Sequence, residues 1–207
     1  LVSLTWGNVS AINADKIFIK PSGVDLNSIE EKDISVVSLD GSFVSGLKPS
    51  VDTPAHVELH SAFKDIKCVV HTHSKYATVF AQLNKHIQCL GTTHADYFKG
   101  SIPAVPIPAW DDNISYEKIT GKAIVSYFKE KDINHNDISA ALVANHGVFA
   151  WGNTIEKALE NAYVLELIAE MAYLTLAIRP RPNELNSKIL EKHFLRKNGN
   201  GKYYGQR

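Results

Sequence analysis

Residues 68–74 (CVVHTHS) constrain the fold more than any other part of the chain, because a short apolar run ends in two histidines one residue apart. A run of this length with β-branched side chains is typical of a buried strand. Alternate residues of a strand point to the same face, so His71 and His73 can present both imidazoles to one ion. The segment therefore predicts a strand that ends in half of a zinc site, although two ordinary turn histidines would leave the same pattern.

Strand-like runs dominate the first half of the chain. Residues 16–20 alternate in polarity, and the runs 34–39 and 42–45 flank Asp40 and Gly41, a pair that is a strong β-hairpin signal. Since a hairpin joins antiparallel strands, the sheet is not expected to be purely parallel. Further extended segments are expected at 87–90, at 140–144 and around Pro103, Pro106 and Pro108, where an edge strand can tolerate proline.

Helical patterns separate these strands and fill the last third of the chain. A long helix is expected to begin at Asn153, which forms a capping-box pattern with Glu156, and to end before Pro180. Its expected buried face carries Ile155, Leu159, Ala162, Leu165, Ile168 and Ala172 at helical spacing. Shorter helices are expected over 54–63, 75–83, 116–131 and 184–197. One α/β domain accounts for this order of elements.

Composition weighs against several classes of function, although a local basic patch is compatible with it. The 22 basic residues cancel the 22 acidic ones, so no global field favours nucleic acid or an anionic membrane. The longest apolar stretch, 162–178, is interrupted by Glu166 and Glu170, which indicates a helix of a water-soluble protein rather than a membrane span. Two cysteines, Cys68 and Cys89, do not make a disulfide framework, so a reducing, cytoplasmic location is expected. The sequence does not begin with Met.

Other metal-ligand candidates lie at the ends of predicted elements. His146 follows an apolar strand and precedes Gly147, and Asp52 lies at the start of a predicted helix, where a carboxylate is stabilised by free N–H groups. With His71 and His73 they make a plausible set of three imidazoles and one carboxylate. The alternative pair His56 and His60 also has metal-ligand spacing, but the His-Glu-x-x-His signature is absent; His94 is a further candidate ligand or proton carrier.

Small polar turns offer candidate anion-binding groups. Residues 20–23 (KPSG) supply an ammonium group, a hydroxyl and accessible backbone N–H groups after a predicted strand. Residues 48–50 (KPS) and 7–8 (GN) are similar turns. Each is weak alone, because Pro, Ser, Gly and Asn are common turn residues. Converging on one site, they would suit a phosphate group.

Six segments in order resemble the epimerases of the class II sugar-phosphate aldolase/epimerase family. They are 4–10 (LTWGNVS), 19–25 (IKPSGVD), 70–74 (VHTHS), 91–98 (GTTHADYF), 193–197 (HFLRK) and 203–206 (YYGQ). The resemblance covers 1–207 and starts where the family's first helix would already have ended. It implies a single domain of three layers, α/β/α, with a central, mainly antiparallel sheet flanked by helices.

The resemblance also implies a role for individual residues. The metal ligands would be Asp52, His71, His73 and His146, with Zn²⁺ the expected ion and Mn²⁺ or Co²⁺ as alternatives. The phosphate site would use Asn8, Lys20, Ser22, Gly23 and Ser50, and the catalytic acid/base pair would be Asp96 and Tyr204. Supporting positions near the substrate would be Thr92, Glu117 and His193.

Residues 51 and 52 distinguish this chain from members of the family. The family's epimerases commonly carry Ser-Ser-Asp where this chain has Ser50, Val51 and Asp52, so one hydroxyl contact to phosphate is lost or replaced by the Val51 backbone N–H. The family's aldolases typically carry Glu at position 52, whereas the Asp found here favours the epimerases.

The implied activity is the interconversion of L-ribulose 5-phosphate and D-xylulose 5-phosphate by cleavage and re-formation of the C3–C4 bond. A class II aldolase that releases a free aldehyde is the alternative, and a non-catalytic family member is a further one. The resemblance implies a homotetramer with active sites between subunits and a phosphorylated pentulose as substrate. Arabinose and ascorbate breakdown both need this step, and the sequence does not choose between them.

Overall fold

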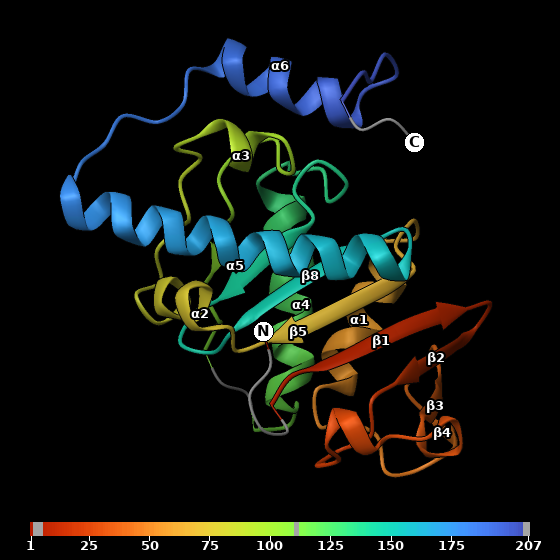
Figure 1. Cartoon of the computed structure of the whole chain (residues 1–207). Coiled ribbons are helices and arrows are strands. Elements are labelled where there is room, and N and C mark those ends of the chain that lie inside the picture. The colour runs from red at the N-terminus through yellow and green to blue at the C-terminus, as the bar shows by residue number, and fades with distance from the viewer. Residues whose placement is uncertain (2–5, 110–111, 205–207) are drawn as a thin grey trace.

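A mixed sheet organises the chain, which is described by a computed structural model for residues 1, 6–109 and 112–204 (Figure 1). Within these residues the sheet has eight strands in the order β4-β3-β2-β1-β5-β8-β7-β6. Every neighbouring pair is antiparallel except β6 with β7. The strands are β1 Asn8–Asn13, β2 Lys16–Ile19, β3 Ser35–Ser38, β4 Phe43–Ser45, β5 Cys68–Thr72, β6 Ala104–Val105, β7 Ala140–Val143 and β8 Val148–Gly152.

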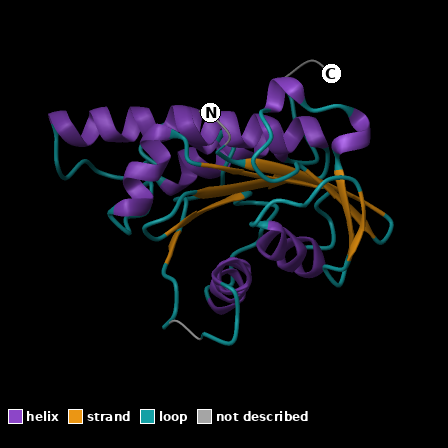
Figure 2. Ribbon diagram, turned by 90° about the horizontal axis from the view of Figure 1, so that it is seen from below, coloured by secondary structure: helices purple, strands orange, loops and turns teal. Residues whose placement is uncertain are grey.

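Helices cover both faces of the sheet, so the expected three-layer α/β/α arrangement is confirmed (Figure 2). Helices α1 Thr53–Ala62 and α4 Tyr116–Glu130 pack on one face, and α2 Lys75–Gln82 and α5 Ile155–Ile178 on the other. Neighbouring strand residues serve opposite layers: Val69 packs with the α1/α4 core, and Val70 with the α2/α5 core. The remaining helices are the short η1 Leu26–Ser28, η2 Glu31–Asp33 and α3 Thr92–Ala95, and the C-terminal α6 Ser187–Asn198.

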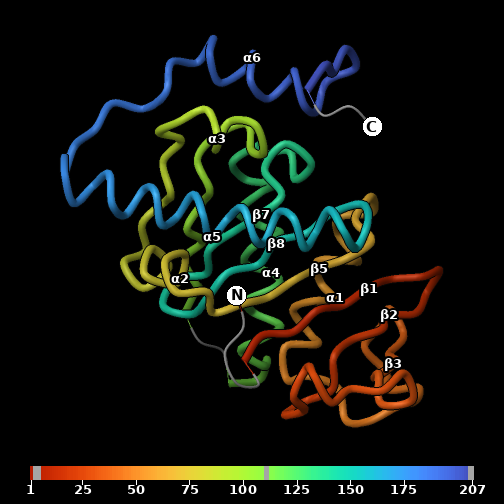
Figure 3. The backbone as a smooth tube through the Cα atoms, viewed as in Figure 1, coloured from red at the N-terminus to blue at the C-terminus, as the bar shows by residue number. Residues whose placement is uncertain are grey.

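Strand β5 is buried along its whole length because β1 and β8 pair with its two edges and helices cover both faces. The backbone trace shows it passing beneath α5 beside β8 (Figure 3). The strand predicted within residues 68–74 is therefore confirmed over Cys68–Thr72, with His73 just beyond its end, and it lies in the middle of the sheet. A rigid central strand is a suitable support for the two histidines at its end.

Most expected elements are present, with some corrections. The hairpin signal lies between the paired strands β3 and β4, and β6 is an edge strand beside the prolines. The strand expected over 87–90 is wrong: that stretch makes only an isolated bridge between Ile87 and Ile102. The cap of α5 is Thr154 rather than Asn153, since the Thr154 hydroxyl accepts a hydrogen bond from the Lys157 N–H.

Helix α5 is long and apolar enough to cross a membrane by length and composition alone. In the fold it is a core helix, because one of its faces packs on the sheet with Ala162, Leu165 and Ala172 buried. Ile155 and Leu159, which were expected on that face, are exposed instead. Glu166 has a separate role: its carboxylate accepts the free backbone N–H groups of Tyr76 and Ala77 in the first turn of α2.

Candidate active site

Three histidines meet where the central strands end. His71 is on β5, His73 follows it, and His146 lies in the turn between β7 and β8. One ring nitrogen from each lies within 4.8 Å of the others, and Nε2 of His71 is 3.1 Å from Nε2 of His73. The pairing of β5 with β8 brings the turn to the strand end, so residues 73 positions apart in the chain become neighbours.

The orientation of His71 is set by its surroundings. Its Nδ1 lies 2.9 Å from the carbonyl oxygen of Val148, which can only accept, so Nδ1 carries the proton and Nε2 the lone pair. The ring also stacks on Phe149, with centroids 4.3 Å apart. This arrangement, in which one nitrogen is hydrogen-bonded and the other points to the cluster, is typical of metal-ligating histidines.

All three imidazoles are held neutral. Burial lowers the pKa of His71 well below its ordinary value, and the neighbouring His146 and His73 lower it further. Burial and then His73 lower the pKa of His146 to about 4, and burial lowers that of His73 against the opposing charge of Asp52. Neutral imidazole is the form that binds metal ions. In the described part of the chain, Nδ1 of His146 is buried without a hydrogen-bond partner.

Asp52 supplies a carboxylate beside the three histidines. It is the N-cap residue of α1, but its side chain makes no capping hydrogen bond and lies instead with Oδ2 3.9 Å from Nε2 of His71. Asn8 donates a 2.7 Å hydrogen bond to the same oxygen. Burial raises the pKa of Asp52, and the hydrogen bond from Asn8 opposes that rise. Three neutral imidazoles beside one carboxylate are a donor set that fits a divalent transition metal, so the cluster can hold such an ion.

A cavity of about 580 Å³ opens beside the cluster. Most residues expected to bind substrate or metal line it: Asn8, Lys20, Ser22, Gly23, Ser50, Val51, Asp52, His73, Glu117 and His146. His71 lies buried behind them. Trp6, Pro21 and Tyr116 also line the cavity and were not expected there; Trp6 and Pro21 lie within the 4–10 and 19–25 segments, and Tyr116 is next to Glu117.

Lys20 is the one lysine or arginine among the described residues that line this cavity. Its side chain is buried, and Nζ donates to the carbonyl of Pro21 at 3.3 Å, which engages one of the three N–H groups of the ammonium. Burial lowers the pKa of Lys20, while the charge of Asp25 raises it. The turn beside it contains Gly23 at φ +70°, a left-handed conformation that favours glycine. A Cβ at this position would meet no atom within 4 Å, so the space beside the turn is open. An ammonium group, two serine hydroxyls and an open glycine turn are suited to bind a phosphate group.

The predicted acid/base residues follow helices α3 and α6, with Asp96 directly after α3 and Tyr204 in the tail after α6. Asp96, at the end of α3, receives hydrogen bonds from Nε and Nη2 of Arg196 at 2.9 and 2.7 Å, and His193 lies 3.1 Å away. The Arg196 guanidinium also lies 4.7 Å from the ring centre of Tyr204. Figure 1 shows α3 and α6 on the opposite side of α5 from β1–β4, and none of these four residues lines the cavity.

Asp96 is held in its ionised form. Burial acts to raise its pKa, but hydrogen bonds from Arg196 and His193 and the charges of both groups outweigh burial, and the pKa is lowered. Thr92, the first residue of α3, lies on the same short helix. Asp96, His193 and Tyr204 were expected from the sequence, whereas Arg196, which contacts Asp96 and Tyr204, was not; its place in the 193–197 segment was the signal available.

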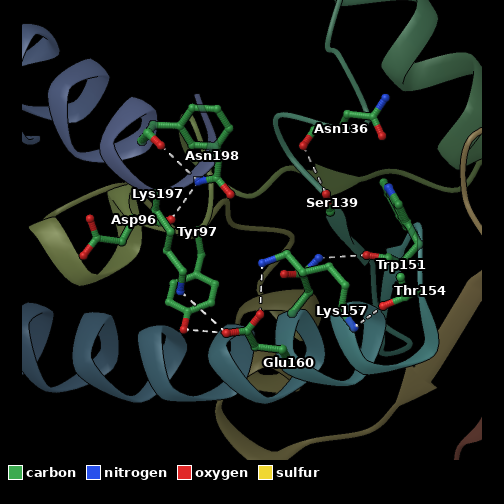
Figure 4. Close-up of polar contacts among 12 residues, drawn as sticks. Asp96, Tyr97, Asn136, Ser139, Trp151, Thr154, Lys157, Glu160, Lys197 and Asn198 are labelled. Atoms are coloured by element: carbon green, nitrogen blue, oxygen red, sulfur yellow. Dashed lines mark hydrogen bonds and ion pairs between the residues drawn. The ribbon is translucent and has the colours of Figure 1, made fainter. Parts of the chain in front are cut away.

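Polar contacts fix α6 to the rest of the fold (Figure 4). The Tyr97 hydroxyl donates to Glu160 of α5, and the Lys197 ammonium lies 3.6 Å from the same carboxylate and 3.2 Å from the centre of the Tyr97 ring. Asn198 donates to the backbone carbonyl of Asp96. These contacts fix the orientation of α6 and therefore the position of the 199–204 tail.

The chain is similar in sequence to known proteins over its whole length. Residues 1–173 match the family model described as "Class II Aldolase and Adducin N-terminal domain". The chain is 45% identical over 212 aligned residues to a Mycoplasma pneumoniae protein named "Probable L-ribulose-5-phosphate 4-epimerase UlaF", covering 100% of this chain and 88% of that protein.

Solved structures share the fold. An L-fuculose 1-phosphate aldolase has a TM-score of 0.76 at 24% identity, covering 92% of this chain and 85% of its own. YgbL from Escherichia coli has a TM-score of 0.74 at 25% identity, covering 93% of this chain and 89% of its own. The overall fold of this chain is therefore shared with these solved structures.

Proposed function

The chain belongs to the class II aldolase and adducin N-terminal domain family, and on that basis we propose that it interconverts L-ribulose 5-phosphate and D-xylulose 5-phosphate. The observation that carries the proposal is the meeting of His71, His73 and His146 with a cavity that also presents Lys20. The name of the Mycoplasma relative, at 45% identity over the whole chain, supports this substrate pair.

The reaction requires more than a proton transfer. C4 of a 2-ketose is not next to the carbonyl carbon, so its configuration can be inverted by breaking and re-forming the C3–C4 bond. Asp52, His71, His73 and His146 would hold Zn²⁺, which when bound supplies Lewis-acid stabilisation of charge on the substrate's oxygens. The same residues would serve Mn²⁺ or Co²⁺.

The phosphate-binding residues have a specific task in this scheme. Cleavage would leave glycolaldehyde phosphate, which must stay bound while its aldehyde group rotates to present its opposite face. Lys20, with the hydroxyls of Ser22 and Ser50, would hold its phosphate, and Asn8 and Gly23 would complete the anchor. Val51 contributes no hydroxyl, so its backbone N–H would serve there. Glu117 would support the substrate from the cavity wall, and Thr92 and His193, which do not line this cavity, would support the substrate of a neighbouring copy.

Asp96 and Tyr204 would transfer protons at the C4 oxygen, one for each face of the aldehyde. Because neither residue lines the cavity of its own chain, both would act on substrate bound at the metal site of a neighbouring copy. The active enzyme would then be a homo-oligomer with its sites between subunits, as in the homotetramer that the resemblance implies. The enzyme would work in the cytoplasm.

Incubation with L-ribulose 5-phosphate tests the proposal. We expect D-xylulose 5-phosphate as product, abolished by chelation and by His73→Ala and unaffected by His86→Gln, which alters an exposed histidine outside the site. Release of free glycolaldehyde phosphate would instead identify an aldolase. A folded, zinc-supplied protein that yields neither product would refute catalysis on this substrate.

Mixing two inactive variants tests the shared site. A His73→Ala subunit keeps its acid/base pair, and a Tyr204→Phe subunit keeps its metal ligands. Mixed assemblies therefore contain some sites with both functions intact, and we expect turnover to return on mixing. Mixed assembly without recovered turnover would contradict sites formed between subunits.

A further inference from the structure

A buried series of hydrogen bonds lies beside the proposed metal site and contains two histidines that the mechanism does not use. His56 and His60 are on α1, with 0% and 3% of their surface exposed. Oγ of Ser10 lies 2.7 Å from Nδ1 of His56 and 2.8 Å from Nε2 of His60. The other nitrogen of His56, Nε2, contacts Oδ1 of Asn8 at 2.5 Å. Their spacing suggested a metal pair, but a serine hydroxyl lies between them.

The protons of this series can be assigned from its end at Asp52. Asn8 faces the carboxylate of Asp52 and the hydroxyl of Ser50, and only its amide NH₂ can donate to an ionised carboxylate. Oδ1 of Asn8 must therefore face His56 and accept from it. His56 then carries its proton on Nε2, which leaves a lone pair on Nδ1.

The assignment continues outward through Ser10. The lone pair on Nδ1 of His56 accepts the Ser10 hydroxyl proton, so Oγ of Ser10 has only acceptor capacity for His60. His60 must then donate from Nε2, and its Nδ1 is left without a proton; this atom has no hydrogen-bond partner among the described residues. Burial keeps both rings neutral, lowering the pKa of His56 to about 3 and that of His60 to about 4. Each hydrogen bond in this series is then donated in the direction of Asp52.

We propose that Ser10, His56 and His60 are positioning residues that fix the amide orientation of Asn8 and thereby hold the Asp52 carboxylate in place for the metal ion. This inference rests on the proposed function in taking Asp52 as a ligand. The residues act through Asn8 and do not touch the substrate. Outer partners of this kind are commonly worth 10- to 100-fold in metal affinity.

The first test reads the protons directly in the metal-free wild-type protein. Long-range ¹H–¹⁵N spectra of the imidazoles distinguish the two neutral tautomers and the cation, and signals are assigned by their loss in His56→Gln and His60→Gln. We expect the Nε2–H tautomer for both rings at neutral pH. The Nδ1–H tautomer or a cation at His56 would overturn the proposal.

The second test measures zinc affinity by competition with a chromophoric chelator. Ser10→Ala frees His56 to change tautomer, so we expect affinity to fall about tenfold. Ser35→Ala is the matched control, because Ser35 is a fully buried serine of the same sheet whose hydroxyl bonds the Leu47 carbonyl, away from the site. Equal zinc affinity in Ser10→Ala and wild type would overturn the proposal.

Neither readout depends on turnover. A wild-type protein that binds zinc with the expected tautomers but does not convert L-ribulose 5-phosphate would refute the proposed function and leave the positioning series standing. Normal epimerase activity with the wrong His56 tautomer would refute only the positioning series. The two proposals therefore fail separately.

Discussion

Gly147 offers a sharp test of the histidine cluster, because a single added carbon would press on two of its members. A Cβ at this position would lie 2.8 Å from the carbonyl oxygen of Thr72, 3.2 Å from Cε1 of His71 and 3.3 Å from Cδ2 of His73. The φ of Gly147 lies outside the left-handed region, so alanine pays no conformational penalty there. The effect of Gly147→Ala is therefore steric.

The magnitude follows from these contacts. Ordinary van der Waals contact begins at 3.4 Å, so the carbonyl must give way by about 0.6 Å (3.4 − 2.8) and the two rings by 0.1 to 0.2 Å. The carbonyl belongs to β5, a central strand paired on both edges, which resists such a shift. Overpacking in such a site costs about 1–3 kcal/mol. If that strain is relieved by displacing the histidines, zinc affinity falls about 5- to 150-fold.

The assay is a competition titration of metal-free protein with zinc and a chromophoric chelator, beside a thermal melt of the same sample. Gly201→Ala is the matched control, since a Cβ there meets nothing within 4 Å. We expect weaker zinc binding only in Gly147→Ala. Wild-type zinc affinity together with a wild-type melting temperature would refute the packing argument.

Three further outcomes follow from individual contacts. Arg196→Met removes the hydrogen bonds and charge that lower the pKa of Asp96, so that pKa rises and the acid limb of the kcat/KM profile moves to higher pH; an unmoved limb would exclude Asp96 as the titrating group. Glu166→Gln removes a charged acceptor from the first turn of α2 and should lower the free energy of unfolding by about 1 kcal/mol, measured by urea titration. An unchanged free energy of unfolding would show that this cap is dispensable. Val51→Ser adds a hydroxyl at the cavity and should lower KM about fivefold, the equivalent of one hydrogen bond; an unchanged KM would place the phosphate elsewhere.

Local pattern was sufficient for the central strand and for much of the rest of the fold. The β-branched run at 68–72 and the Asp40-Gly41 hairpin signal each encode their structure within a few residues, and both are present. The 87–90 stretch misled because its apolar residues pack against other segments without continuous pairing, which depends on tertiary contacts. The exposed face of α5 was misjudged for a related reason. Helical spacing marks an apolar stripe but does not reveal that the sheet covers Ala158 and Ala162 and leaves Ile155 and Leu159 exposed.

The site divides in the same way between local and distant information. His71 and His73 could be paired from their spacing, since a strand places alternate residues on one face. His146 reaches this pair through the pairing of β5 with β8, and Asp52 through its place at the start of α1. Neither approach can be derived from the local sequence, so only the family resemblance linked all four residues in advance. Arg196 was missed because nothing in its own segment indicates a partner 100 positions earlier in the chain.

The two halves of the proposed site rest on different physical supports. The histidine cluster is held by the central sheet, where a shift of β5 would disturb both neighbouring strands and two core layers. Asp96 and Tyr204 depend instead on α6, which is fixed by ion pairs and hydrogen bonds with few buried apolar side chains. Added salt screens the ion pairs of α6, although less than fully exposed pairs because they are partly buried, whereas it does not screen apolar contacts. Raising ionic strength should therefore loosen the acid/base half of the site before the metal half, so that kcat falls at salt concentrations where zinc affinity is unchanged.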